Sequence, residues 1–191
     1  MRLTLVTAPT QEPASLEDAL TFLRVDNADE SPLVEALLAA GREIIEKYTS
    51  RALLTQTLKA TVDAFPTGRT IELPRVPLAS VTSIKYWPAS GGAQTTWASD
   101  NYTVITATNQ IVILDGTDWP DTAVRPDAVE ITYVAGATAP GAVPAPLRHA
   151  VLLMCSHLYE NRATVANAAM FDVPMSLKHI LEAYKTEGWC A

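Results

Sequence analysis

The fold is decided within residues 33–65, which read LVEALLAAGREIIEKYTSRALLTQTLKATVDAF. In the first half, apolar residues recur every three or four positions, which is the period of an amphipathic helix. From Thr57 to Asp63, apolar and polar residues alternate, which is the period of a strand with one buried face. The segment therefore predicts a helix followed by a β-strand, and with it a fold that mixes the two kinds of structure.

The predicted helix runs from Ser31 to about Tyr48, with Pro32 in its first turn, where a missing N–H does no harm. It carries two adjacent apolar stripes, and a helix of this kind has two packing partners. The first stripe consists of Leu33, Leu37, Ala40, Ile44 and Tyr48. The second consists of Val34, Leu38, Gly41 and Ile45. We expect one partner to be another copy of the chain, in contact with Val34, Leu38 and Ile45.

Three more helices and six more strands follow from the same patterns. The helices are expected at residues 15–25, 147–162 and 174–186, the first with Ser15 as N-cap and Asp18 completing a capping box. The strands are expected at residues 70–74, 80–87, 93–97, 101–106, 110–114 and 128–134. Turn residues separate these short strands, as in a small antiparallel sheet, sandwich or barrel. Trp87, Trp97 and Trp119 are expected to help fill its core.

The order of elements predicts an α+β protein: a four-helix bundle, with two N-terminal and two C-terminal helices, and an inserted small antiparallel β domain. The expected boundaries are 1–56 for the N-terminal helices, 57–143 for the β domain and 144–191 for the C-terminal helices and tail. A Gly/Pro-rich linker, residues 136–146, precedes the third helix.

Composition excludes several classes of protein. The chain of 191 residues has 14 basic and 21 acidic residues and a net charge of −7, which disfavours binding to nucleic acid through its phosphates. No segment reaches the ~18 apolar residues of a membrane span, and the N-terminus does not resemble a signal peptide. Two cysteines make no disulfide framework. We expect a soluble protein that is not exported and does not contact a membrane.

The reactive side chains form no recognisable site. In the helix LRHAVLLMCSHLYENR (147–162), Cys155 falls in the apolar stripe and His157 lies about 160° away around the axis. His149 and His157 are about 12 Å apart along the axis, too far to bind one metal ion. Cys155 is therefore interpreted as a small buried hydrophobe. No catalytic, cofactor or metal-binding residues are predicted.

Two acidic clusters are candidate sites. The spacing of Asp26, Asp29 and Glu30 matches no calcium loop and is typical of a solvated connector. Asp115, Asp118 and Asp121 lie among turn residues, and they leave a hydrolase that uses this loop as a minor alternative. The chain contains no GxSxG, P-loop, GxGxxG, HExxH or CxxC motif.

Nearly the whole chain resembles the head–tail connector (adaptor) proteins of long-tailed bacteriophages and gene transfer agents. The resemblance is carried, in order, by the stretches TAPTQEPASLEDALTFLRVDNADE, LVEALLAAGREIIEKYTSRALLTQTL, ELPRVPLASVTSIKYW, VPAPLRHAVLLMCSHLYENR and VPMSLKHILEAYK. The chain departs from the family pattern at TEGWCA, which extends past the last helix.

The resemblance implies a structural virion protein rather than an enzyme. Such proteins form a ring, commonly dodecameric, at the head–tail interface, after assembly in the cytoplasm of the bacterial host. The implied partners are the portal protein, further copies of the chain, and a tail-completion, stopper or tail terminator protein. DNA passes through the ring without specific binding, and an acidic wall suits that role because it repels phosphates.

The resemblance also implies a portal-docking element near the C-terminus, formed by Leu177, Ile180, Leu181, Tyr184, Lys185 and Trp189. The alternative is that this last helix only closes the bundle. For the whole chain, the alternative to a connector is a soluble β-domain binding module unrelated to phages.

Overall fold

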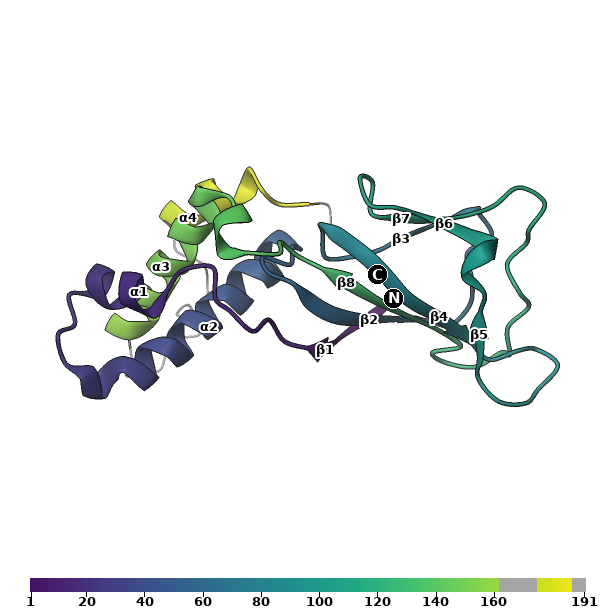
Figure 1. Cartoon of the computed structure of the whole chain (residues 1–191), viewed down its shortest axis with the longest axis horizontal. Helices are drawn as coiled ribbons and strands as arrows, with labels where there is room; N and C mark the ends of the chain where they lie inside the picture. Colours follow the sequence, from purple (N-terminus) through teal and green to yellow (C-terminus); the bar gives the residue numbers. More distant parts are fainter. Residues whose placement is uncertain (162–174, 187–191) are drawn as a thin grey trace. The chain divides into compact units, whose positions relative to one another are not determined.

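The computed structural model describes residues 1–161 and 175–186 and contains both helices and antiparallel sheets (Figure 1). The predicted α+β class is thereby confirmed. The described residues divide into two compact units. The β unit contains Met1–Pro9 and Thr55–Ala137, and the helical unit contains Thr10–Leu54 and the described residues from Thr138 onward.

The β unit contains two antiparallel sheets. The larger has the strand order β1-β2-β8-β4-β5, and the smaller has the order β3-β7-β6. The strands are β1 (Arg2–Thr7), β2 (Gln56–Val62), β3 (Thr70–Glu72), β4 (Leu78–Tyr86), β5 (Thr95–Trp97), β6 (Tyr102–Ile105), β7 (Gln110–Ile113) and β8 (Val129–Ala135). All seven strands expected from the sequence are present, with ends shifted by a few residues.

Strand β1 was missed by the sequence analysis. It pairs with β2 from Arg2↔Thr61 to Thr7↔Thr57, yet five of its six residues are exposed. When both faces of a strand are exposed, its apolar and polar residues need not alternate, so the sequence carries no strand pattern. Residues 1–9, grouped with the N-terminal helices by the sequence analysis, pack instead with the β unit.

The core of the β unit is built on β8, whose residues alternate between buried and half-buried along its whole length. In the same unit, Phe65 stacks on Trp119 at 4.9 Å between ring centroids, and Trp97 stacks on Tyr102 at 5.3 Å. Trp97 is buried, as expected, while Trp87 and Trp119 are half-buried. Trp97 therefore belongs to the core of the unit, while Trp87 and Trp119 lie at its margin.

The helical unit contains α1 (Leu16–Leu23), α2 (Ser31–Thr49), α3 (Ala145–Glu160) and α4 (Met175–Glu182). Short 3₁₀ turns occur at Ala28–Glu30, Ser99–Asn101 and Pro140–Ala142, the second of them in the β unit. The capping box predicted for α1 is present, since Asp18 N donates to Ser15 Oγ at 3.0 Å. Ser15 N in turn donates to Asp18 Oδ2 at 3.3 Å.

Gly41 lies where α2 and α3 approach each other closely. A Cβ atom at this position would lie 3.3 Å from Val151 O and 3.4 Å from Cys155 N, both atoms of the α3 backbone. Backbone atoms inside a helix cannot move aside as a flexible side chain does. The absence of a side chain at residue 41 therefore sets the distance between the two helices.

We expect Gly41→Leu to lower the free energy of unfolding by about 1–3 kcal/mol, because the added side chain forces α2 away from α3. Urea unfolding followed by circular dichroism measures the change. Gly141→Leu is the matched control, since nothing lies within 4 Å of a Cβ atom there. Equal stability of the two variants would contradict the close contact.

Candidate assembly surface

The second apolar stripe of α2 faces the interior of the helical unit. Val34, Leu38 and Ile45 are all buried within the chain, and the carbonyl oxygen of Val34 lies 4.0 Å from Cys155 Sγ on α3. No surface on these three side chains is left for a neighbouring subunit. This placement corrects the predicted intersubunit contact, because the stripe that contains Gly41 is the one that packs against α3.

The first stripe of α2 is the more open one. Leu33 is 39% exposed, and Leu37, Ala40, Ile44 and Tyr48 are half-buried. The sequence predicted two stripes but assigned the outward one to the wrong set of residues. Gly41 was the available signal, since a small residue in a helical stripe allows another helix to approach closely.

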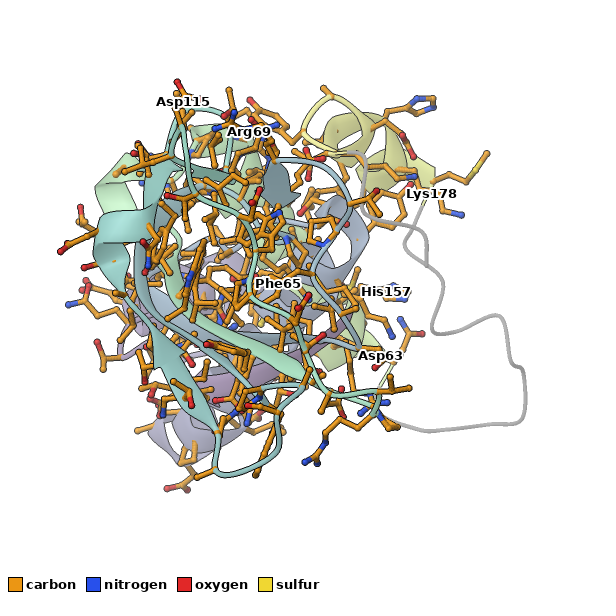
Figure 2. The ribbon with its side chains drawn as sticks, turned by 90° about the vertical axis from the view of Figure 1, so that its right-hand side faces the viewer. Asp63, Phe65, Arg69, Asp115, His157 and Lys178 are labelled. Carbon is orange, nitrogen blue, oxygen red and sulfur yellow. The ribbon has the colours of Figure 1, made fainter. Side chains whose placement is uncertain are left out.

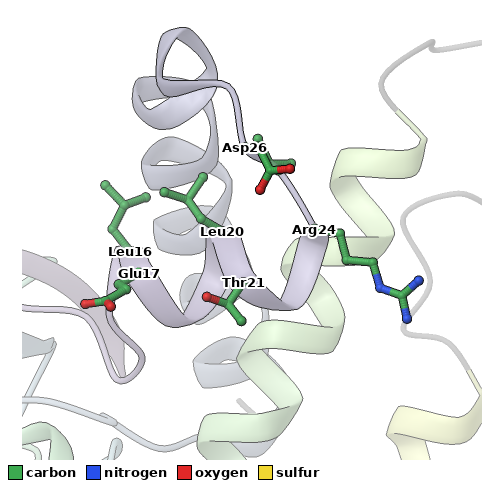
Figure 3. A pocket seen from close by; sticks show the side chains of 7 residues that line it. Leu16, Glu17, Leu20, Thr21, Arg24 and Asp26 are labelled. Carbon is green, nitrogen blue, oxygen red and sulfur yellow. The ribbon is translucent and has the colours of Figure 1, made fainter.

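A groove on α1 supplies a second partly apolar surface that the sequence analysis did not single out. It has a volume of about 660 Å³, and it is lined by Leu16, Glu17, Leu20, Thr21, Arg24, Val25 and Asp26. Figure 3 shows Leu16 and Leu20 on one side of α1, near the connector that carries Asp26, while Arg24 points away from them. The groove therefore combines the aliphatic side chains of Leu16 and Leu20 with charged residues of both signs at its margin.

The groove is open because α1 buries little of itself. Ala19 is its buried residue, while Leu16, Leu20 and Leu23 are half-buried and Phe22 is exposed. The ring of Phe22 meets the ring of His149 edge-on at 5.8 Å. The spacing of the leucines predicted an inward stripe, and the structure instead leaves part of that stripe in contact with solvent.

Helix α4 is fixed to the helical unit by apolar and polar contacts. Leu177 and Leu181 are buried, Tyr48 Oη donates to Glu182 Oε1 at 2.6 Å, and Arg51 Nε donates to Tyr184 O at 2.6 Å. Burial corrects the predicted portal-docking role of Leu177 and Leu181, which close the unit instead. Ile180 and Tyr184 are half-buried and Lys185 is exposed, whereas Trp189 lies outside the described residues.

The reactive side chains do not converge. Cys155 is buried, and loss of hydration raises its thiol pKa to about 11. His149 contacts Phe22, while His157 lies near the end of α3 beside Asn161. Within residues 1–161 and 175–186, no group of three His, Cys, Asp or Glu side chains is placed to hold a metal ion.

The acidic side chains of the two clusters are either paired with other residues or exposed to solvent. Asp115 forms an ion pair with Arg69 at 2.7 Å, and Figure 2 shows the two side by side. Asp118 and Asp121 are exposed. Glu30 accepts a hydrogen bond from Tyr159 Oη at 2.7 Å, whereas Asp26 belongs to the groove on α1. Neither cluster forms a shared carboxylate site.

A buried ion network braces the inner side of α2. The guanidinium of Arg42 lies 2.9 Å from Glu12 Oε2 and 3.1 Å from Glu46 Oε2. Glu46 Oε1 accepts from Leu53 N at 2.7 Å, which ties the segment after α2 back to the helix. Burial raises the pKa of Glu12, and the charge of Arg42 acts in the opposite direction. One arginine thus holds together the chain before α2 and the chain after it.

Comparison with solved structures relates the whole chain to particle necks. It aligns with a chain in the neck of an empty GTA particle, computed with C6 symmetry, and with a chain in the virion of a native gene transfer agent (GTA) particle. Each alignment has a TM-score of 0.77 and 26% identity and covers 97% of this chain and 96% of the other.

A chain in the neck of a native GTA particle, computed with C12 symmetry, aligns over the same shares of the two chains, with a TM-score of 0.69 and 28% identity. No protein-family model and no curated protein sequence matches the chain. No helix in the described part of the chain is long and apolar enough to span a membrane.

We expect the Cys155 thiol to react with Ellman's reagent only when the protein unfolds. Its burial both blocks access and disfavours the reactive thiolate. The measurement uses the Cys190→Ser variant, so that a single thiol is counted, at pH 8 with and without 6 M guanidinium chloride. One reacting thiol per native chain would contradict the buried placement.

Arg42→Leu should lower the free energy of unfolding at pH 7 by about 3–5 kcal/mol, because it leaves buried carboxylates without their partner. Without the charge of Arg42, the pKa of the Glu12 carboxyl rises further than in the wild-type protein, so the variant gains more stability than the wild type as pH falls. The deficit of the variant should therefore shrink between pH 7 and pH 5.

Urea unfolding at several pH values measures this trend. Glu43→Leu is the matched control, since Glu43 is exposed and lies 3.6 Å from Arg42, and it should change stability by less than about 1 kcal/mol. A deficit for Arg42→Leu that stays constant with pH would show that lost packing, and not the unpaired carboxylates, causes it.

Proposed function

We propose that this chain is a structural virion protein: a head–tail connector (adaptor) that forms a ring between the portal and the tail and continues the DNA channel. The observation that carries the proposal is the full-length alignment with chains of GTA necks at TM-scores of up to 0.77. The C6 and C12 symmetries applied to two of these necks support assembly as a ring.

The architecture suits a connector. We propose that the four helices work as one connector bundle and that residues 57–143 are a β domain inserted into it. The contacts of α2 with α1, α3 and α4 support a single helical unit. The three-part division at residues 56 and 143 is likewise a proposal, with β1 as an N-terminal strand added to the inserted domain.

The proposed role requires surfaces rather than a reaction centre. The groove on α1 and the first stripe of α2 provide partly exposed apolar area on the helical unit. Among the docking residues expected from the sequence, Ile180, Tyr184 and Lys185 keep exposed area on or just after α4. We propose that these three take part in contact with the portal, and that a tail-completion, stopper or tail terminator protein contacts another face of the ring.

The net charge of −7 is consistent with a conduit. Binding to DNA through its phosphates requires basic residues that displace counterions. A ring with an acidic balance gives the passing phosphates no such partners, and DNA can slide without being held. The proposal therefore includes passage of DNA without specific binding.

Deletion of the gene in particle-producing cells tests the proposal. We expect DNA-filled heads and separate tails, because a connector is needed to join the two after packaging. Electron microscopy and DNase-protection assays of the particles measure both products. A plasmid copy of the gene should restore joined particles. Normal numbers of tailed particles from the deletion strain would overturn the proposed role.

A further inference from the structure

Arg148 carries a positive charge that has no partner within the described chain. It is the fourth residue of α3 and is half-buried. Its Nε atom has almost no accessible surface and donates no hydrogen bond, and no carboxylate in residues 1–161 and 175–186 forms an ion pair with it. The two terminal nitrogens are the part of the guanidinium that keeps accessible surface. The cation is therefore recessed at its base and open at its tip.

This arrangement is costly for a single subunit. A buried donor without an acceptor loses its hydration and gains nothing in return. Long cationic side chains usually avoid this cost by extending the charged group into water. Arg148 also lies near the N-terminal end of α3, where the helix dipole disfavours a positive charge. Arg42, by contrast, lies 2.9 and 3.1 Å from two carboxylates of its own chain. The fold thus supplies at Arg42 what it does not supply at Arg148.

The surroundings of Arg148 favour a carboxylate as the missing partner. Leu152 lies one turn further along the same side of α3, and it is also half-buried. An apolar side chain beside the cation helps to exclude water from a contact, and the attraction between opposite charges is stronger where water is excluded. The planar guanidinium presents its N–H groups in the geometry that carboxylate oxygens accept.

A second copy of the chain is a ready source of carboxylates. The chain has 21 acidic and only 14 basic residues. In the helical unit, Asp26, Asp29 and Glu35 are exposed, and none of them forms an ion pair with another described residue. DNA phosphates would be the other anions in a connector. A cation that held them would oppose the passage of DNA, which favours the carboxylate.

We propose that Arg148 of one copy binds a carboxylate of a second copy, and that this ion pair forms only on assembly. This inference rests on the proposed ring. The arginine and the carboxylate lie on different surfaces, so the contact is heterologous, and it closes into a ring when its rotation divides a full turn. The free subunit bears the cost of an unpaired cation, and the assembled ring recovers it.

Removal of the charge tests the ion pair. Full-length Arg148→Leu is returned to the deletion strain, joined particles are counted, and the purified variant is unfolded with urea. We expect an unfolding midpoint equal to or above that of the wild type, because an apolar side chain removes the uncompensated donor. We expect about tenfold fewer joined particles, because the carboxylate of the second copy loses its partner. Arg148→Lys keeps the charge and should give an intermediate yield.

Lys47→Leu is the matched control, because it removes one positive charge at an exposed position of α2, and its yield should be normal. A lowered unfolding midpoint for Arg148→Leu would show that the arginine serves the fold. A normal yield from it, an equal loss from Lys47→Leu, or no gain from Arg148→Lys would show that assembly does not read this charge. Each of these results would overturn the ion pair and leave the connector role intact. The connector role fails separately, if the deletion strain makes joined particles.

A carbodiimide identifies the partner. This reagent joins an amine and a carboxylate in contact through an amide bond and takes up the released water as a urea. In particles that carry Arg148→Lys, we expect the peptide containing position 148 to be linked to an Asp or Glu peptide of a second copy, in a product of about twice the mass of the chain. No link, a link within one chain, a link to a protein of another mass, or a product removed by DNase would overturn the assignment of a second copy.

Discussion

The helical unit depends on the close approach of α2 and α3 at Gly41. With no side chain at that position, the α3 backbone comes within contact distance of α2, and this contact selects which apolar stripe of α2 is buried. Val34, Leu38 and Ile45 lie on the same side of α2 as Gly41 and are buried in the core. The stripe that begins at Leu33 is left partly exposed as a consequence. The absence of a Cβ atom at Gly41 therefore determines which apolar stripe of α2 is buried in the unit and which stripe stays partly exposed.

The ion pairs of Arg42 also hold segments of the helical unit together, through charge and not through close packing. The two close carboxylates come from the segment before α1 and from α2 itself, and Glu46 also receives the backbone N–H of Leu53. Burial of these ions is costly unless each finds a partner. Each of these ions has a partner. The contacts of Arg42 with Glu12 and Glu46, and of Glu46 with Leu53, therefore fix the segments in which the chain enters and leaves the helical unit.

Much of the fold could be predicted from the sequence, because most elements carry a clear period. The helix of α2 and the alternation in β2 and β8 follow directly from burial on one face. Strand β1 could not be found in this way, since it is exposed on both faces and is held by its pairing with β2. The burial of Cys155 was predictable from its place in a stripe. The sequence did not predict which stripe of α2 faces the interior. A helical period gives the angle between two stripes, but it does not say which element packs against each of them.

The partly exposed leucines of α1 and α2 suit the proposed assembly of several copies into a ring. A subunit whose partner surfaces were fully apolar would associate without order as soon as it was made. Side chains that are half-buried in the lone subunit can stay in contact with water, and they lose the rest of their exposed area when a correct neighbour arrives. A charge at the margin of such a surface restricts which neighbours it accepts, because an unmatched charge at a closing interface opposes the contact more strongly than a matched pair favours it.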